Sequence, residues 1–71
     1  MQEWQDIGAA LDRARPKFPD VDHFYHRMDA GDYPDSVGCL NLMLKKGVPL
    51  DVAASIAAHA TGVPFGELIN A

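Results

Sequence analysis

Gly47-Val48-Pro49-Leu50 recurs as Gly62-Val63-Pro64-Phe65, and this repeat decides how the second half of the chain folds. The glycine of each copy suits the left-handed backbone that closes a helix, and the valine can cover that end with an apolar contact. The proline then opens the next helix at a position that needs no backbone N–H. The two copies therefore predict one helix at about residues 49–61 and a short one at 64–70.

Upstream of the repeat, apolar residues recur three and four apart, which is the pattern of amphipathic helices. A first helix is expected over residues 2–14 and is closed by Pro16, because proline disfavours helical backbone in the residue before it. A second begins at Pro19 or Asp20 and ends at Gly31. The apolar positions of these two helices are Trp4, Ile7, Leu11, Ala14, Val21, Phe24, Tyr25 and Met28.

A third helix follows a turn at residues 32–36, where Ser36 is the expected cap. It ends at the cationic stretch Lys45-Lys46 and the stop residue Gly47. Its apolar face holds Val37, Leu40 and Leu44, with Cys39 and Met43 close to that face. The fourth helix, 49–61, contains five alanines, and such small side chains let neighbouring backbones approach closely. We therefore expect the fourth helix to be central.

The length of the chain limits its domain organisation, and its cysteine content indicates its compartment. Seventy-one residues suffice for one domain, 1–71, with a modest core. Cys39 is the one cysteine, so no internal disulfide is possible, and a lone thiol is typical of a reducing, cytoplasmic compartment. Residues 1–4 are not the basic start of a signal peptide, and no apolar run reaches about 20 residues, so no membrane span is expected.

One segment resembles a known DNA-binding motif. Ala58-His59-Ala60-Thr61-Gly62-Val63, followed by Leu68, is similar to the centre of the helix-turn-helix of phage repressors and Cro-like regulators. The likeness covers residues 52–69. It implies a helix-turn-helix corner and a DNA-binding transcriptional regulator that acts as a homodimer. The sequence accordingly predicts an all-α fold, a compact bundle of four to five short helices with a helix-turn-helix-like C-terminal half.

The charges of that segment depart from the pattern of the family. Of its last helix, only Glu67 and Asn70 have side chains suited to base edges, and no lysine or arginine follows Lys46. Because DNA affinity comes largely from neutralising phosphates, nucleic acid is not the expected partner. Convergence in space of the upstream basic residues would reverse this expectation. Those residues are Arg13, Arg15, Lys17, Lys45 and Lys46.

Acidic residues are concentrated in one stretch. Residues 18–36 hold five aspartates against one arginine, a balance of −4 that equals the net charge of the whole chain. Aspartates are common at helix starts and in turns, so caps and solubility explain them most simply. The alternative is an acidic face that docks on a basic groove of another protein. The candidate partner-binding residues, including an aromatic near the chain start, are Trp4, Asp20, Asp22, Tyr25, Asp29, Asp32, Tyr33 and Asp35.

The sequence offers little that would support catalysis or a cofactor. His23 and His26 are three apart with Asp22 nearby, but a closed zinc site needs four ligands, so no metal is expected. Cys39 lies within an apolar stripe and is expected to be structural rather than a nucleophile. No glycine-rich phosphate loop is present. We expect no enzyme activity, no catalytic residues and no cofactor.

These observations predict a small acidic regulatory or inhibitory protein that acts by binding another protein, such as a nucleic-acid-binding protein with a basic surface. In size and charge the chain is similar to small phage and mobile-element proteins such as anti-CRISPR proteins and anti-activators. Two alternatives stay open. One is the DNA-binding regulator described above. The other is a structural oligomerisation domain whose apolar strip needs a second copy.

Overall fold

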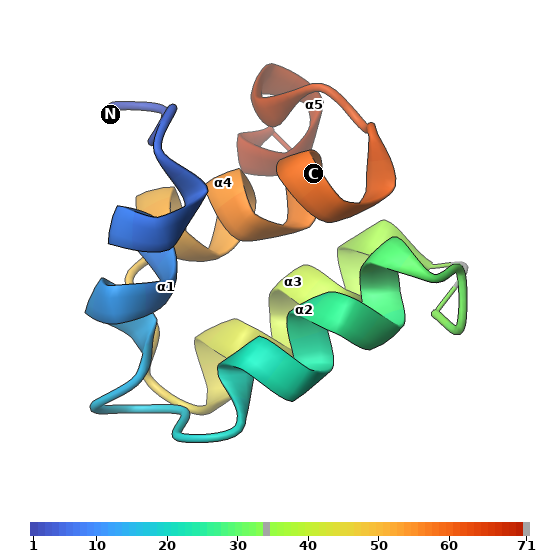
Figure 1. Cartoon of the computed structure of the whole chain (residues 1–71). Helices are drawn as coiled ribbons and strands as arrows, with labels where there is room; N and C mark the ends of the chain where they lie inside the picture. The colour runs from blue at the N-terminus through green and yellow to red at the C-terminus, as the bar shows by residue number, and fades with distance from the viewer. Residues whose placement is uncertain (34, 71) are drawn as a thin grey trace.

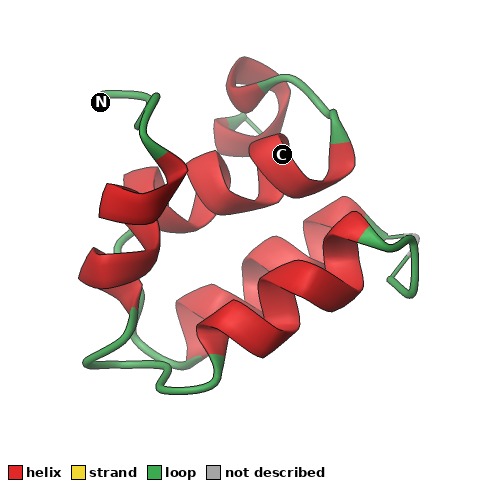
Figure 2. Cartoon of the chain, viewed as in Figure 1, coloured by secondary structure: helices red, strands yellow, loops and turns green. Residues whose placement is uncertain are grey.

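Five helices joined by short turns make up the computed structural model, which describes residues 1–33 and 35–70 (Figure 1). No strand occurs in this described part, so the predicted all-α class is confirmed (Figure 2). Pro34, which the sequence places in a turn, lies outside the described residues. The helices are α1 (Ile7–Ala14), α2 (Val21–Asp29), α3 (Ser36–Lys45), α4 (Leu50–Thr61) and α5 (Phe65–Ile69).

Helix α4 is the centre of the bundle, as its alanines predict. It packs against each of the other four helices, whereas direct packing between α2 and α3 is slight. Six consecutive residues of α4, from Val52 to Ala57, are all buried, and six residues cover every face of a helix. Three of these six are alanines, which let the surrounding backbones come close.

Glycines with left-handed backbone end three of the helices, as the sequence predicts. Gly47 has φ +97°, and the N–H of Val48 after it donates to the carbonyl of Met43 at 3.1 Å. Val48 is buried and covers that helix end. Gly62 has φ +81° and closes α4, and Gly31 has φ +85° and closes α2. Only glycine adopts this conformation without steric cost from a Cβ.

The prolines of the repeat stand one residue earlier than predicted. Pro49 and Pro64 precede α4 and α5 with extended ψ values of 146° and 139°, so they are the capping residues and not the first helical ones. The carbonyl of Pro49 accepts the first helical bond, from the N–H of Ala53 at 2.9 Å. A residue at this position needs no N–H in the helix, which is why proline is suitable there.

Two helix starts differ from the prediction because aspartates cap them. Helix α1 begins at Ile7 and not at residue 2, since Asp6 Oδ1 accepts hydrogen bonds from the N–H groups of Gly8 and Ala9 at 3.0 and 3.3 Å. Helix α3 is capped by Asp35, whose Oδ1 accepts from the N–H of Gly38 at 3.1 Å, and not by Ser36. In both cases the carboxylate satisfies N–H groups that have no partner within the helix.

The core of the bundle lies where all helices meet α4. From α3 it takes Cys39, Leu40 and Met43, which are buried, but not Val37, which was expected there and is 39% exposed. At 100° per residue, Val37 lies on a flank of α3 beside the buried face rather than on it. No helix in the described chain combines the length and the apolar character needed to cross a membrane.

Candidate functional site

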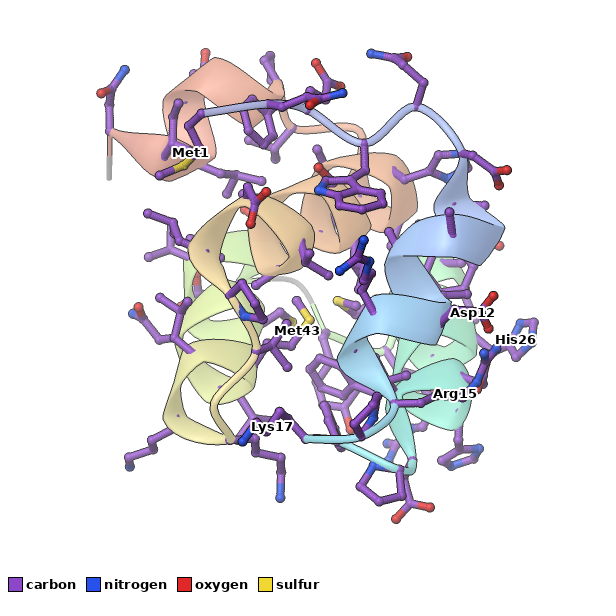
Figure 3. All side chains as sticks on the ribbon, turned by 90° about the vertical axis from the view of Figure 1, so that its left-hand side faces the viewer. Met1, Asp12, Arg15, Lys17, His26 and Met43 are labelled. Carbon is purple, nitrogen blue, oxygen red and sulfur yellow. The ribbon has the colours of Figure 1, made fainter. Side chains whose placement is uncertain are left out.

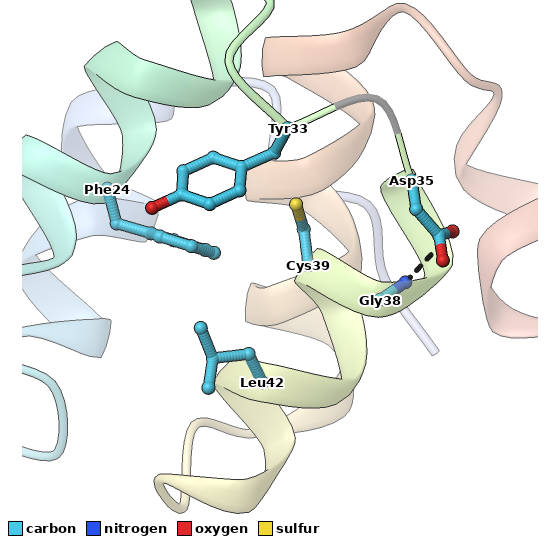
Figure 4. Close-up of a pocket in the computed structure, with 6 residues that line it drawn as sticks. All are labelled: Phe24, Tyr33, Asp35, Gly38, Cys39 and Leu42. Atoms are coloured by element: carbon cyan, nitrogen blue, oxygen red, sulfur yellow. Dashed lines mark hydrogen bonds between the residues drawn. The ribbon is translucent and has the colours of Figure 1, made fainter.

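A surface hollow lies between α2 and α3, because these two helices pack on α4 more than on each other. It measures about 180 Å³. Phe24 of α2 forms one wall, and Cys39 and Leu42 of α3 form the other, while the ring of Tyr33 crosses above them (Figure 4). Among the described residues that line the hollow, Asp35 alone is charged. The hollow is thus an apolar recess with a carboxylate at its margin.

Tyr33 is held in place from two sides. Its ring centroid lies 5.1 Å from that of Phe24, with the rings inclined at 49°. The guanidinium carbon of Arg27 lies 4.8 Å from the Tyr33 ring centroid, which is a cation–π contact. Arg27 Nε also donates to Asp32 Oδ2 at 3.5 Å. The Tyr33 ring is therefore a fixed, half-exposed feature of this surface.

A second hollow of about 280 Å³ lies on the other side of Tyr33. It is more polar than the first, since Asp29, Ser36 and Thr61 are among its lining residues. Tyr33 lines both hollows, with Asp29 beside one and Asp35 beside the other. We call this region, formed by Asp29, Asp32, Tyr33, Asp35 and Leu42, the α2–α3 end.

The remaining candidate aspartates lie at the opposite end of α2. Asp22 accepts two hydrogen bonds from the guanidinium of Arg15, at 2.7 and 2.8 Å, and Arg15 also pairs with Asp12 (Figure 3). Hydrogen bonding to Arg15 lowers the pKa of the Asp22 carboxyl below its ordinary value. Asp20 stands before α2 without a side-chain capping bond. The acidic stretch of the sequence is therefore two separate groups in space, one of them partly neutralised.

Trp4 lies against α4, away from the α2–α3 end. Its backbone N–H donates to Ser55 Oγ at 2.8 Å, and its indole N–H donates to Asp51 Oδ2 at 3.1 Å. The guanidinium carbon of Arg13 lies 5.3 Å from the indole. Asp51 is near the start of α4, whereas Thr61, at its end, lines the second hollow together with Tyr33. The two residues are about 15 Å apart along α4, given a rise of 1.5 Å per residue. The structure therefore does not bring Trp4 together with the candidate residues around Tyr33.

Tyr25 connects α2 to α4. Its hydroxyl lies 2.9 Å from His59 Nδ1, and its ring contacts the edge of His26. Burial raises the pKa of Tyr25, and the charge of Asp29 raises it further. Within residues 1–33 and 35–70, no three or more His, Cys, Asp or Glu side chains are arranged to hold a metal ion. His23 and His26 therefore belong to no such group.

Cys39 is buried, as the sequence predicts, with 4% of its surface exposed. Burial raises the pKa of its thiol, and the carboxylate of Asp35 raises it further. Since the thiolate is the nucleophile, this environment keeps Cys39 in its unreactive neutral form.

Two of the basic residues gather at the end of α4 that is remote from α5. Lys46 Nζ lies 5.0 Å from the ring of Phe18, and the side chain of Lys17 passes beside Gly47 (Figure 3). Gly47 precedes the start of α4, and α5 follows the end of α4. These two ends of α4 are about 18 Å apart, given its 12 residues. Arg15 pairs with aspartates, and Lys17 and Lys46 lie at the far end of α4, so these three do not contribute to a positive surface beside α5.

The hollow itself is the feature that sequence reasoning missed. Its signals are a glycine, Gly38, inside a helix and an apolar residue, Leu42, outside the expected stripe of α3. Both mark a helix face that is neither packed nor polar. No family model, curated protein or solved structure matches this chain, so its function is inferred from the geometry of its surfaces.

Proposed function

We propose that this chain is a small non-catalytic protein that regulates or inhibits another protein by binding it through the α2–α3 end. One observation carries the proposal: Tyr33 stands between two surface hollows, with Asp29 beside one and Asp35 beside the other. Aromatic residues in well-packed positions are the usual anchors of protein interfaces. A fixed tyrosine between recesses offers such an anchor at little conformational cost.

Charge indicates the kind of partner. The segment 27–35 holds three aspartates and one arginine, a balance of −2. Arg27 is already engaged with Tyr33 and Asp32, so the carboxylates dominate what this end presents. Complementary potentials guide association and exclude partners of like charge. The matching partner has a basic surface, as nucleic-acid-binding proteins do.

The test is affinity capture from a lysate of the organism that encodes the chain. The wild type is compared with the double variant Asp29→Lys/Asp32→Lys and with the control Glu67→Lys, which reverses an exposed charge on α5. We expect the wild type and the control to retain one dominant protein, and the double variant to lose about tenfold or more of it. Circular dichroism verifies that all three are folded.

Equal capture by the double variant would contradict the proposal. A second contrary result would be retardation of a labelled DNA duplex by micromolar protein at low salt, since even non-specific DNA binders respond under these conditions. That outcome would support the helix-turn-helix regulator instead.

A further inference from the structure

The hollow between α2 and α3 has the size of one large apolar side chain. It measures about 180 Å³, whereas an apolar cavity of about 150 Å³ is enough to hold a benzene ring in a protein. Gly38 also lines it, and a Cβ at this position would lie 3.0 Å from Asp35 Oδ2. The same glycine lets the Asp35 carboxylate reach its capping bond. A side chain at position 38 would therefore crowd the carboxylate at the margin of the hollow.

The interior of the hollow favours an uncharged group. Its walls are the rings of Phe24 and Tyr33, the Cys39 thiol and the aliphatic side chain of Leu42 (Figure 4). A charged group in the interior would lose its hydration, and the charged lining residue, Asp35, stands at the margin, so an uncharged side chain suits the interior. A phenylalanine or leucine side chain would bury apolar surface against these walls.

The margin of the hollow, in contrast, favours a cation. Asp35 lines the mouth, and its Oδ1 is occupied by the N–H of Gly38 while the side chain as a whole is exposed. Asp32 is next to Tyr33 in the chain, and Asp29 lines the hollow on the far side of that ring. A lysine or arginine that follows the buried side chain would lie beside these carboxylates.

From these three observations we infer that the hollow is a socket for a single phenylalanine or leucine side chain of a partner protein, in a segment where that residue is flanked by lysine or arginine. The inference rests on the proposed function and specifies the chemistry that the α2–α3 end recognises.

A second copy of this chain does not present such a segment. The exposed large apolar residues of the described chain are Met1, Val37 and Leu42, and none of them has a basic neighbour in the sequence. Of the apolar residues next to a lysine or arginine, Ala14, Phe18 and Met28 are buried, and Leu44, which precedes Lys45, is half-buried against the core. The occupant is therefore expected to come from a different protein.

The inference is tested by NMR titration of the ¹⁵N-labelled chain with three blocked tripeptides. These have phenylalanine between two arginines, phenylalanine between two glutamates, and alanine between two arginines. We expect the first to shift the amide signals of Tyr33, Gly38 and Cys39 with a dissociation constant of about 1 mM, which is typical of so small a ligand. The glutamate peptide should bind several times more weakly, and the alanine peptide should leave these signals unshifted.

The structure supplies a matched pair of variants. Leu42 and Val37 lie on the same helix and are both 39% exposed, but only Leu42 lines the hollow. We expect Leu42→Lys to abolish binding of the phenylalanine–arginine peptide and Val37→Lys to preserve it. Should Leu42→Lys perturb the amide spectrum beyond the neighbourhood of α3, Leu42→Ser replaces it with the same expectation.

Three results would overturn the inference. They are equal binding of the two phenylalanine peptides, unchanged binding by Leu42→Lys, and signal shifts that depend on protein concentration without peptide, which would indicate a second copy in the hollow. Capture from lysate distinguishes failure of the socket inference from failure of the proposed function. If Asp29→Lys/Asp32→Lys loses the partner while Leu42→Lys retains it, the proposed function stands and the socket does not. If no variant alters capture, both fail.

Discussion

The indole N–H of Trp4 donates a hydrogen bond to Asp51 Oδ2 across 3.1 Å, joining residues that are 47 positions apart in the chain. The backbone N–H of Trp4 donates to Ser55 Oγ one turn further along α4, and that hydroxyl in turn donates to the carbonyl of Asp51. The segment before α1 is therefore fastened to the central helix. Trp4 is the one tryptophan of the chain, so tryptophan fluorescence reports on the surroundings of this residue alone.

Loss of the Asp51 carboxylate should loosen that contact. We expect Asp51→Ala to lower the free energy of unfolding by about 1 kcal/mol, the usual net value of one hydrogen bond. The Trp4 emission should move to longer wavelength as the indole becomes more hydrated. In a double-mutant cycle with Trp4→Phe, the coupling energy should also be about 1 kcal/mol. If the changes in the free energy of unfolding, measured by urea denaturation, are strictly additive for the two substitutions, the bond contributes nothing. The control is Glu3→Ala, which changes an exposed neighbour of Trp4.

Gly62 and Gly66 should respond to alanine in opposite directions. A Cβ at either position meets no atom within 4 Å, so packing does not distinguish them. Gly62 has φ +81°, and alanine in the left-handed region costs about 1–2 kcal/mol. Gly66 lies within α5, where alanine is favoured by about 0.5–1 kcal/mol. Denaturation midpoints should fall for Gly62→Ala and rise for Gly66→Ala. A rise in both variants would be incompatible with the turn described above.

The pair of Arg15 and Asp22 should make stability depend on acid pH. Arg15 lowers the pKa of Asp22 from its ordinary value of 3.8. A carboxyl whose pKa is depressed by folding stabilises the native state above its unfolded pKa, and this stabilisation is lost as the pH falls through the folded value. Asp22→Asn should therefore lower Tm at neutral pH, and the difference from wild type should shrink as the pH falls below 3.8.

Asp20→Asn is the matched control for this pair, because Asp20 makes no capping bond with its side chain. Its Tm should follow the wild type across the same range. Added salt should reduce the effect of Asp22→Asn, since both partners are partly exposed. A difference that does not shrink at all as the pH falls below 3.8 would assign the effect of Asp22→Asn to something other than the ion pair.

Tyr25 should ionise above the ordinary phenol pKa of 10.0. Burial is the main cause, and the negative charge of Asp29 adds to it by opposing the phenolate. Titration followed by the ¹³Cζ signal of Tyr25 should show Asp29→Asn lowering this pKa part of the way, because burial remains. Since the folded state favours the neutral phenol, stability should decline as the pH rises above 10.0. The same pKa in Asp29→Asn and wild type would exclude a contribution from Asp29.

Helix identity and most helix ends follow from short-range signals in the sequence. The repeat around Gly47 and Gly62 predicts two helix ends correctly, because left-handed backbone and the following apolar residue act within one turn. The alanines of α4 also predict its central place, because small side chains let neighbouring backbones come close. The starts of α1 and α3 differ from the prediction for separate reasons. Trp4 continues the apolar spacing of α1 although Asp6 caps the helix after it, and Asp35 takes the capping position expected for its neighbour Ser36.

The surfaces, in contrast, were decided by tertiary structure. The concentration of acidic residues identified Tyr33 and the aspartates as candidates, yet the sequence did not show that Arg15 would occupy Asp22 or that Asp51 would hold Trp4. It also did not reveal the hollow beside Leu42, which exists because α2 and α3 both pack on α4 and leave a space between them. Local propensity acts over a few residues, whereas a pairing or a recess depends on how whole helices are placed around the core. That placement results from packing all of the buried side chains at once.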